Sequence, residues 1–399
     1  MDEVKIEKWV YGGAGLARTA EGVTLVPFVM PGERVKLEGA RRRAGVMEAR
    51  AAEIVEKSPD RIEPACAVFG RCGGCHYQMA PYGFQIDAKL AILREVLERV
   101  GRLKAPEGIR VVQGEPWGYR NRSQFHFGHH TLGYRMAGSE KVVDVAECPI
   151  SAPAVNAALK ALRAARRDRR FPRFLKQVEL FTNGERTMVN VLDTEQGRGV
   201  SKGFFAWLAE RIPGAADGEI LYEACGERFR VSHRSFFQVN RFLIGPLVEC
   251  ALEGAEGEEA LDLYAGVGLF TVPLARRIAR VTGVESDGSA ARDLEFNLAA
   301  AGVTAEARRL QAEQYLEDLT KRPDFVLADP PRAGLGKRVV KELIRLRPPR
   351  MNIVSCDPAT LARDLAALCA AGYEMEGLVL IDLFPQTYHM ETVARLRLS

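Results

Sequence analysis

The sequence lacks several features that would assign its class at once. No run of roughly 18 apolar residues occurs, so no membrane span is expected. The N-terminus is charged and has no apolar stretch of signal-peptide length, and we therefore expect a cytoplasmic protein. The net charge is only +4, so the chain as a whole is not strongly basic.

Ordered structure is nevertheless indicated throughout. Hydrophobic residues make up 47% and charged residues 27% of the 399 positions, which are values typical of globular proteins. A chain of this length exceeds a single ordinary core, so two or three domains are expected. We expect a monomer. The eight cysteines do not indicate disulfides in a cytoplasmic protein.

The spacing of apolar runs and turns predicts three domains. Residues 1–57 contain several short apolar or alternating runs separated by glycine-rich turns, which favours a small oligonucleotide-binding (OB)-like β-barrel. Residues 58–230 contain an amphipathic helix at 84–101 and then mostly antiparallel strands. Residues 231–399 alternate between strands and helices, which predicts an α/β domain with a parallel sheet covered on both faces.

Three cysteines are bunched near the start of the second domain. Cys66, Cys72 and Cys75 follow the pattern C-x5-C-G-G-C, and Cys148 stands before a proline. Cysteine followed by proline recurs at iron–sulfur ligands. Zinc also suits four cysteines, but the two matched C-x2-C pairs of a zinc knuckle are absent. The set therefore favours an iron–sulfur cluster over zinc.

Positive charge is concentrated rather than spread. Residues 163–176 hold seven basic side chains and one acid, Asp168, within a helix predicted over 152–170 and the segment after it. A smaller cluster lies at 41–43. Each cluster fits a solvated face or a contact surface for a phosphate backbone.

The third domain carries signs of a nucleoside cofactor. Gly266 and Gly268 follow the first predicted strand, and Glu285 closes the second strand 19 residues after Gly266. A glycine turn admits a ligand to the backbone, and an acid at the next strand end can bind ribose hydroxyls. Both features fit S-adenosylmethionine as well as NAD. A turn of sequence DPPR at 329–332 favours a methyltransferase, with arginine where amine methyltransferases carry an aromatic residue.

One cysteine of this domain is a candidate nucleophile. Cys356 ends an apolar run at 351–354 and precedes a predicted helix at 359–368. Free cysteine is more often an inert core thiol, and Cys369 keeps that interpretation. A turn before a helix N-terminus would favour the thiolate form of Cys356.

Together these motifs resemble the RNA uracil-5 methyltransferase family. The resemblance rests on five segments in order: FFQVN at 236–240, LDLYAGVG at 261–268, DPPRAG at 329–334, SCDPATLARD at 355–364 and FPQTYHMET at 384–392. The four clustered cysteines behind an N-terminal barrel resemble the branch that acts on 23S ribosomal RNA, which has a TRAM domain and a [4Fe-4S] cluster. The tRNA branch generally lacks both.

The resemblance implies a reaction and a role for each motif. A thiolate, here Cys356, adds to C6 of uracil and makes C5 nucleophilic toward the methyl group of S-adenosylmethionine. Glu391 is the implied base that removes the C5 proton. The cofactor is implied to be held by four residues: Gln238, Tyr264, Glu285 and Asp329. The target uridine must be flipped out of its stack.

The resemblance also bears on the competing functions. RNA cytosine-5 methyltransferases carry a second cysteine beside proline in the motif that is DPPR here. A non-catalytic RNA-binding assembly factor would not need Cys356 and Glu391 together. Action on tRNA instead of 23S ribosomal RNA remains an alternative, and the sequence does not name the uridine. The family further implies that the helix at 84–101 packs on the methyltransferase domain.

Overall fold

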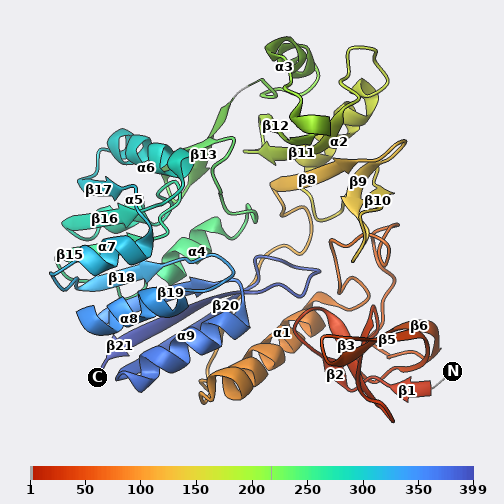
Figure 1. Ribbon diagram of the computed structural model, residues 1–399, viewed down its shortest axis with the longest axis horizontal. Helices are drawn as coiled ribbons and strands as arrows, with labels where there is room; N and C mark the ends of the chain where they lie inside the picture. The colour runs from red at the N-terminus through yellow and green to blue at the C-terminus, as the bar shows by residue number, and fades with distance from the viewer. Residues whose placement is uncertain (1–2, 217) are drawn as a thin grey trace. The chain divides into compact units, whose positions relative to one another are not determined.

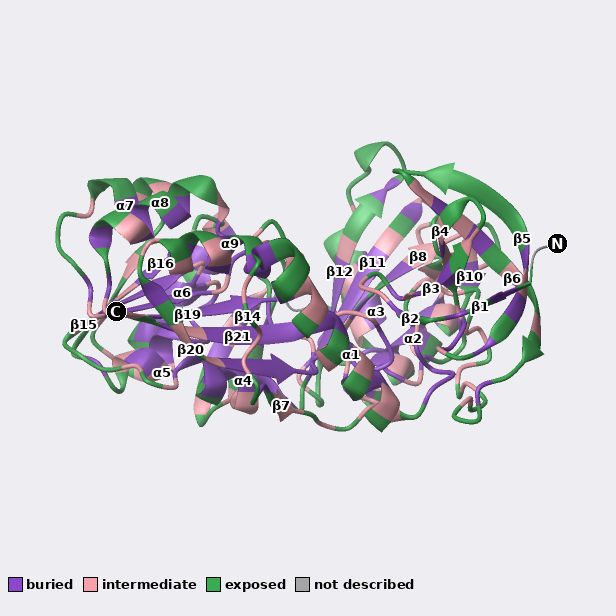
Figure 2. Ribbon diagram, turned by 90° about the horizontal axis from the view of Figure 1, so that it is seen from below, coloured by how far each residue is buried: buried purple, intermediate pink, exposed green. Residues whose placement is uncertain are grey.

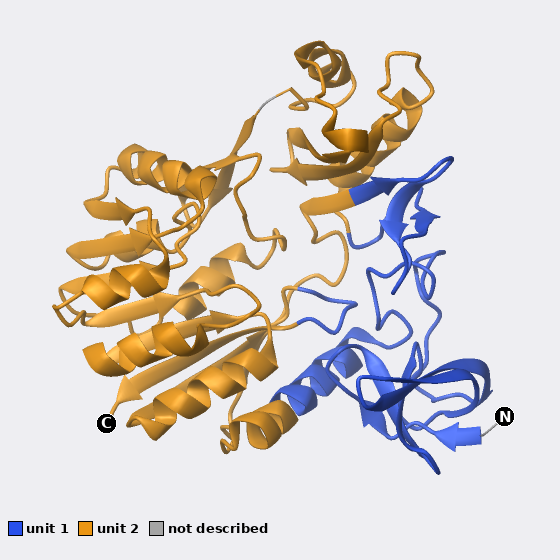
Figure 3. Cartoon of the chain, viewed as in Figure 1, with its two compact units in different colours: residues 1–93, 125–150, 384–389 blue, residues 94–124, 151–383, 390–399 orange. Residues whose placement is uncertain are grey.

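The computed structural model describes residues 3–216 and 218–399 (Figure 1). Packing divides the chain into two compact units that do not follow chain order (Figure 3). Unit 1 comprises Met1–Leu93, Phe125–Ile150 and Phe384–His389, and unit 2 comprises Arg94–Gln124, Ser151–Leu383 and Met390–Ser399. Because the units recombine distant segments, the limits 1–57, 58–230 and 231–399 stay a prediction.

Unit 1 begins with a six-stranded sheet in the order β1-β5-β6-β4-β3-β2. Alternate side chains of these strands point to one side and form a core that includes Val26, Val35 and Leu37. The short apolar runs expected in residues 1–57 are confirmed as strands, and the first of them is divided into β1 and β2. The strands are β1 (Glu3–Lys5), β2 (Lys8–Trp9), β3 (Ala14–Thr19), β4 (Gly22–Pro27), β5 (Arg34–Arg43) and β6 (Val46–Glu56).

The predicted helix at 84–101 is α1 (Tyr82–Val96) followed by a π-helical turn, η1 (Leu97–Gly101). The turn packs on α9 (Pro358–Ala370), where a Cβ on Gly101 would stand 2.9 Å from the carbonyl oxygen of Ala362. This close approach requires glycine. The end of the early helix is therefore built into unit 2, together with β7 (Arg110–Val112).

The middle of the chain is mostly antiparallel β structure, as expected. One prediction is wrong: the basic helix, expected to reach residue 170, ends at Ala165, and residues 166–174 form turns and bends before β11. Asp168 accepts the backbone N–H of Arg170 at 2.9 Å, which turns the chain in the manner of an Asx turn. The elements are β8 (Arg122–Phe127), β9 (Leu132–Arg135), β10 (Val142–Asp144), α2 (Pro153–Ala165), β11 (Leu175–Thr182), β12 (Thr187–Thr194), η2 (Glu195–Gly197), α3 (Lys202–Ala209), β13 (Glu219–Ala224) and β14 (Glu227–Ser232).

The α/β fold predicted for the C-terminal third is confirmed. Its eight-stranded sheet has the order β17-β16-β15-β18-β19-β21-β20-β7. The first five strands of that order are parallel, and β21 is antiparallel to both neighbours. The elements are α4 (Ile244–Ala251), β15 (Glu259–Leu263), α5 (Thr271–Ala275), β16 (Arg280–Val284), α6 (Gly288–Ala301), β17 (Ala305–Arg308), α7 (Ala312–Asp318), β18 (Phe325–Ala328), α8 (Gly336–Leu346), β19 (Arg350–Ser355), α9, β20 (Tyr373–Ile381) and β21 (Glu391–Leu398).

Helices cover both faces of this sheet. Figure 2 shows α7, α8 and α9 on one face and α4 and α5 on the other. The central strands are consequently buried along almost their whole length, which explains their continuous apolar runs. An early segment, β7, pairs in parallel with β20 and completes the edge. No helix among the described residues is both long and apolar enough to cross a membrane.

Candidate active site

The candidate residues of the α/β domain gather at one edge of its sheet. Tyr264, Glu285 and Asp329 directly follow the carboxyl ends of β15, β16 and β18. Cys356 directly follows β19, and Glu391 begins the antiparallel strand β21 at the same edge. This is where open α/β sheets bind their ligands.

A left-handed turn after β15 shapes the cofactor side of this edge. Tyr264 and Gly266 have positive φ angles of 65° and 57°. A Cβ added to Gly266 would meet no atom within 4 Å, whereas one on Gly268 would stand 2.8 Å from the Leu294 side chain. Gly266 thus leaves open space for a ligand, while Gly268 serves packing.

Glu285 is fixed beside that turn by two backbone donors. Its Oε2 accepts the N–H of Gly266 at 2.9 Å, and its Oε1 accepts the N–H of Asp287 at 2.6 Å. Each carboxylate oxygen retains a further lone pair. The carboxylate is therefore oriented in a way that suits two ribose hydroxyls.

A buried carboxyl that no sequence motif had assigned to the site, Asp262, lies two residues before Tyr264. Asp262 on β15 is fully buried, and its Oδ2 accepts the Thr271 hydroxyl at 2.5 Å, while its Oδ1 has no protein partner. Burial, and next the charges of Asp329 and Glu285, raise its pKa to about 7. Burial also raises the pKa of Asp329 to about 7. The aspartate of LDLYAGVG was the available signal for Asp262.

Tyr264 faces a second acid that the sequence had left unassigned. Burial, and then the charge of Glu313 at the start of α7, raise the pKa of the Tyr264 phenol. Glu313 follows the strand β17 of the parallel sheet. No sharp motif marks this position, so only the fold brings it to the cofactor edge.

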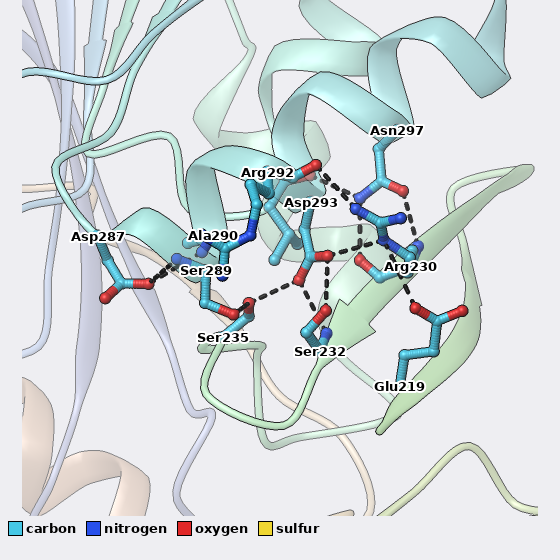
Figure 4. A network of polar contacts seen from close by, with 11 residues as sticks. Glu219, Arg230, Ser232, Ser235, Asp287, Ser289, Ala290, Arg292, Asp293 and Asn297 are labelled. Atoms are coloured by element: carbon cyan, nitrogen blue, oxygen red, sulfur yellow. Dashed lines mark hydrogen bonds and ion pairs between the residues drawn. The ribbon is translucent and has the colours of Figure 1, made fainter. Parts of the chain in front are cut away.

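Gln238 is buried and follows a segment that α6 holds in place (Figure 4). Asp293 of α6 accepts hydrogen bonds from Ser232 N and Oγ, both at 2.8 Å, and from Ser235 Oγ at 2.6 Å. Arg230 adds an ion pair with Asp293 at 2.8 Å. The segment therefore reaches Gln238 from a fixed anchor.

Cys356 lies in the turn directly before α9. Asp357 caps α9 by accepting the N–H groups of Ala359 and Thr360 at 2.9 and 3.0 Å. Burial, and next the charge of Glu391, raise the pKa of the thiol to about 12. This direction is opposite to the one expected from the helix N-terminus, and the preference for the thiolate stays a prediction.

Glu391 lies near Cys356. Ser355, the last residue of β19, pairs with Thr392 of β21, and Cys356 and Glu391 are the chain neighbours of this pair. The charge of Glu391 raises the pKa of the Cys356 thiol, so the two groups are close enough to interact. Burial, and then Asp329, raise the pKa of Glu391 well above its usual value.

Arg332 supplies positive charge near this pair. It is exposed on the DPPR turn, and its charge lowers the pKa of both Cys356 and Glu391, against the larger effect of burial. An exposed guanidinium here is able to meet a carbonyl oxygen or a phosphate of the substrate.

The four clustered cysteines all belong to unit 1. Burial, and then the neighbouring thiols Cys148 and Cys66, raise the pKa of Cys72 to about 11. Burial, and then the other three thiols, also raise the pKa of Cys75. Within the described residues, however, no three His, Cys, Asp or Glu side chains are grouped so that they could hold a metal ion. The cluster thus stays a prediction.

Comparison with known proteins decides the family. The chain matches the model of the family described as tRNA (Uracil-5-)-methyltransferase over residues 222–398. It is 33% identical over 420 residues to the 23S rRNA (uracil(1939)-C(5))-methyltransferase RlmD of Salmonella typhimurium, covering 98% of this chain and 94% of that protein. The chain belongs to the RNA uracil-5 methyltransferase family.

Further relatives agree with this assignment. An RNA methyltransferase of Thermotoga maritima is 32% identical, covering 99% of each chain. The crystal structure of the Pyrococcus abyssi tRNA (uracil-54, C5)-methyltransferase in complex with S-adenosyl-L-homocysteine superposes with a TM-score of 0.76 at 26% identity, covering 98% of this chain and 100% of that one. The chain is therefore an RNA (uracil-5-)-methyltransferase that uses S-adenosylmethionine, rather than an RNA cytosine-5 methyltransferase or a non-catalytic assembly factor.

Proposed function

We propose that this enzyme methylates C5 of a uridine in 23S ribosomal RNA through a covalent bond between Cys356 and C6 of the base. The observation that supports the proposal is that Cys356 and Glu391 flank the Ser355–Thr392 pair of β19 and β21, at the edge where the cofactor turn lies. The ribosomal substrate is favoured by full-length similarity to 23S rRNA methyltransferases. The particular uridine is left open.

The cofactor site is proposed to consist of Gln238, Tyr264, Glu285 and Asp329. The open space beside Gly266 and the unpartnered buried oxygen of Asp262 fit a bound nucleoside with polar substituents. S-adenosylmethionine supplies the methyl group as an electrophilic sulfonium carbon. The residues of this edge bind its ribose and orient its methyl group toward the side of the sheet that carries Cys356.

The chemistry of the protein groups is a sequence of proton and electron-pair movements. The thiol of Cys356 loses its proton to solvent water, and the sulfur electron pair forms the bond to C6, which moves the C5–C6 π electrons into an enolate with negative charge on the uracil carbonyl. Arg332 is proposed to stabilise that charge. C5 then receives the methyl group. Glu391 next takes the C5 proton, the C5–C6 double bond reforms, and the C6–S electrons return to sulfur.

The decisive experiment maps 5-methyluridine in ribosomal and transfer RNA from cells with and without the gene. We expect one or more 23S sites to lose the methyl group in the deletion strain and to regain it when the gene is restored. Loss confined to tRNA would establish the second candidate function, a tRNA uracil-5 methyltransferase. That candidate is favoured by the tRNA enzyme superposing over the whole chain.

We further propose that Cys66, Cys72, Cys75 and Cys148 hold a [4Fe-4S] cluster. The residues fit this group because the thiols influence one another's pKa, and because the N–H of Gly74 points to Cys72 Sγ at 3.4 Å. Cysteine thiolates are the usual ligands of such clusters.

Anaerobic purification tests the cluster directly. The protein is expected to be brown, to absorb near roughly 400 nm and to contain about four irons per chain. Replacing Cys75 with serine is expected to remove the colour, whereas replacing the distant Cys369 leaves it. Zinc without iron would refute the cluster.

The N-terminal six-stranded sheet is proposed to be the RNA-binding barrel of TRAM type.

A further inference from the structure

The loop that precedes the proposed base does not pack with the strands that it connects. It spans Phe384–His389 between β20 and β21, and it belongs to unit 1, whereas both strands belong to unit 2 (Figure 3). Only Met390 separates it from Glu391. Whatever fixes this loop therefore also limits where β21 begins.

A buried glutamine of α1 fastens the middle of the loop. The Gln85 side chain is fully buried. Its amide nitrogen donates to Gln386 Oε1 at 3.0 Å, and its amide oxygen accepts the backbone N–H of Gln386 at 3.0 Å. The same nitrogen lies 3.2 Å from Tyr77 O and 3.0 Å from Ala80 O. One side chain thus joins α1, the segment before it and the loop.

Gln386 is held in a conformation that few side chains adopt. Its φ angle is 69°, in the left-handed region that disfavours residues other than glycine. Its carbonyl oxygen accepts the N–H groups of both His76 and Tyr77, at 2.8 and 3.0 Å. Strained backbone of this kind persists only where surrounding contacts over-determine it.

A buried lysine fastens the start of the loop. Lys89 lies one helical turn after Gln85 and is fully buried, and its ammonium donates to the carbonyl oxygen of Phe384 at 3.0 Å. Burying an ammonium group costs free energy unless protein groups form hydrogen bonds or ion pairs with it. Thr387 Oγ1 donates to the same carbonyl at 2.9 Å, so the loop entrance is closed from two directions.

The network continues to the cysteine segment. His76 and Tyr77 directly follow Cys75. Gln78 lies next in the chain, is buried, and accepts the backbone N–H of Cys66 at 3.1 Å. The loop before the base and the predicted cluster ligands therefore share one set of hydrogen bonds.

We propose that Gln85 and Lys89 are positioning residues for the methyl-transfer reaction: they lock the Phe384–His389 loop and thereby hold Glu391 close to Cys356. The proposal rests on the proposed function, because it assigns the proton-removal step to Glu391. That step requires a carboxylate within hydrogen-bond reach of C5. Glu391 forms the first pair of β21, with Ile381 of β20, and the loop contacts fix the chain directly before this terminal pair.

The test compares Gln85→Leu and Lys89→Met with a matched control, Asp87→Asn, which alters an exposed residue of the same helix. Hydrogen exchange of the 384–389 peptide is measured together with single-turnover methylation of RNA. In both test variants we expect faster exchange in this peptide, an unchanged Kd for S-adenosylhomocysteine and methyl transfer at the normal rate. Release of methylated RNA from Cys356 should slow about ten- to a hundredfold. The control should match the wild type.

The outcomes separate this proposal from the one on which it rests. Normal release by a Glu391→Gln variant would refute the assigned base and not the loop contacts. Slow release by Glu391→Gln with normal release by Gln85→Leu and Lys89→Met would overturn the positioning role, as would unchanged exchange of the loop in both variants. If Gln85→Leu does not fold, Lys89→Met decides, since methionine keeps the aliphatic volume of the lysine stem.

Discussion

Replacing Glu391 with glutamine separates methyl transfer from product release. The side chain is 5% exposed, and burial raises its pKa well above the usual value. Glutamine is a neutral amide of nearly equal size and fits the same space. We therefore expect little change in thermal stability. The amide cannot take the C5 proton, however, so the Cys356–C6 bond cannot break after methylation.

The size of the effect follows from the role of a positioned base. Such a group contributes about 10²–10⁴-fold, or roughly 2.7–5.4 kcal/mol of activation free energy at 1.36 kcal/mol per tenfold. The adduct should still form, so the variant transfers about one methyl group per enzyme and then stops.

The assay uses S-adenosylmethionine labelled in its methyl group and a 23S RNA fragment, with denaturing gels that retain the protein–RNA adduct. Labelled adduct should accumulate with Glu391→Gln and be absent with Cys356→Ala. A matched control is Glu374→Gln, which neutralises an exposed carboxylate on the adjacent strand β20 and should behave as the wild type. Repeated turnover by Glu391→Gln at the wild-type rate would refute the assignment.

Three further predictions concern charge. The pKa values of Cys356 and Glu391 are both raised, and both groups must lose a proton to act. The value of kcat/KM should therefore rise with pH across the neutral range. A plateau of kcat/KM that begins below about pH 6 would contradict this direction. Replacing Asp293 with alanine should destabilise unit 2 by about 1–3 kcal/mol, because it leaves Ser232 N and Ser235 Oγ without their acceptor. It should also weaken S-adenosylhomocysteine binding; an unchanged melting temperature and Kd would refute its anchoring role. Neutralising the basic segment after α2 should lower the salt dependence of RNA binding by about 0.7–0.9 in log–log slope for each RNA phosphate that the segment no longer neutralises. Neutralising the arginines that already pair with Glu48 should lower it less. A slope equal to that of the wild type in the first variant would refute RNA binding by the segment after α2. The substituted residues are Arg167, Arg169 and Arg173 in the first case, and Arg41 and Arg43 in the second.

The sequence by itself was enough to predict the α/β domain, the candidate site residues and the family. The alternation of strands and helices after residue 231 predicted the α/β domain, because strands buried on both faces must be continuously apolar. Short motifs identified Cys356, Glu285 and the DPPR turn as candidates. Each follows directly after an apolar run that predicts a strand, so its place at a strand end can be recognised from the sequence. Membership of the family followed from the order of the motifs.

Only the tertiary structure decided how those residues act together. The proximity of Glu391 to Cys356 depends on the register between β19 and β21, which are separated by a helix, a strand and a loop. The raised pKa of the thiol results from burial and a neighbouring carboxyl, neither of which a local motif records. The contacts of Gln85 with Gln386 join residues 301 positions apart. Long-range pairings of this kind leave no periodic signal in a single sequence, because each partner is locally an ordinary glutamine.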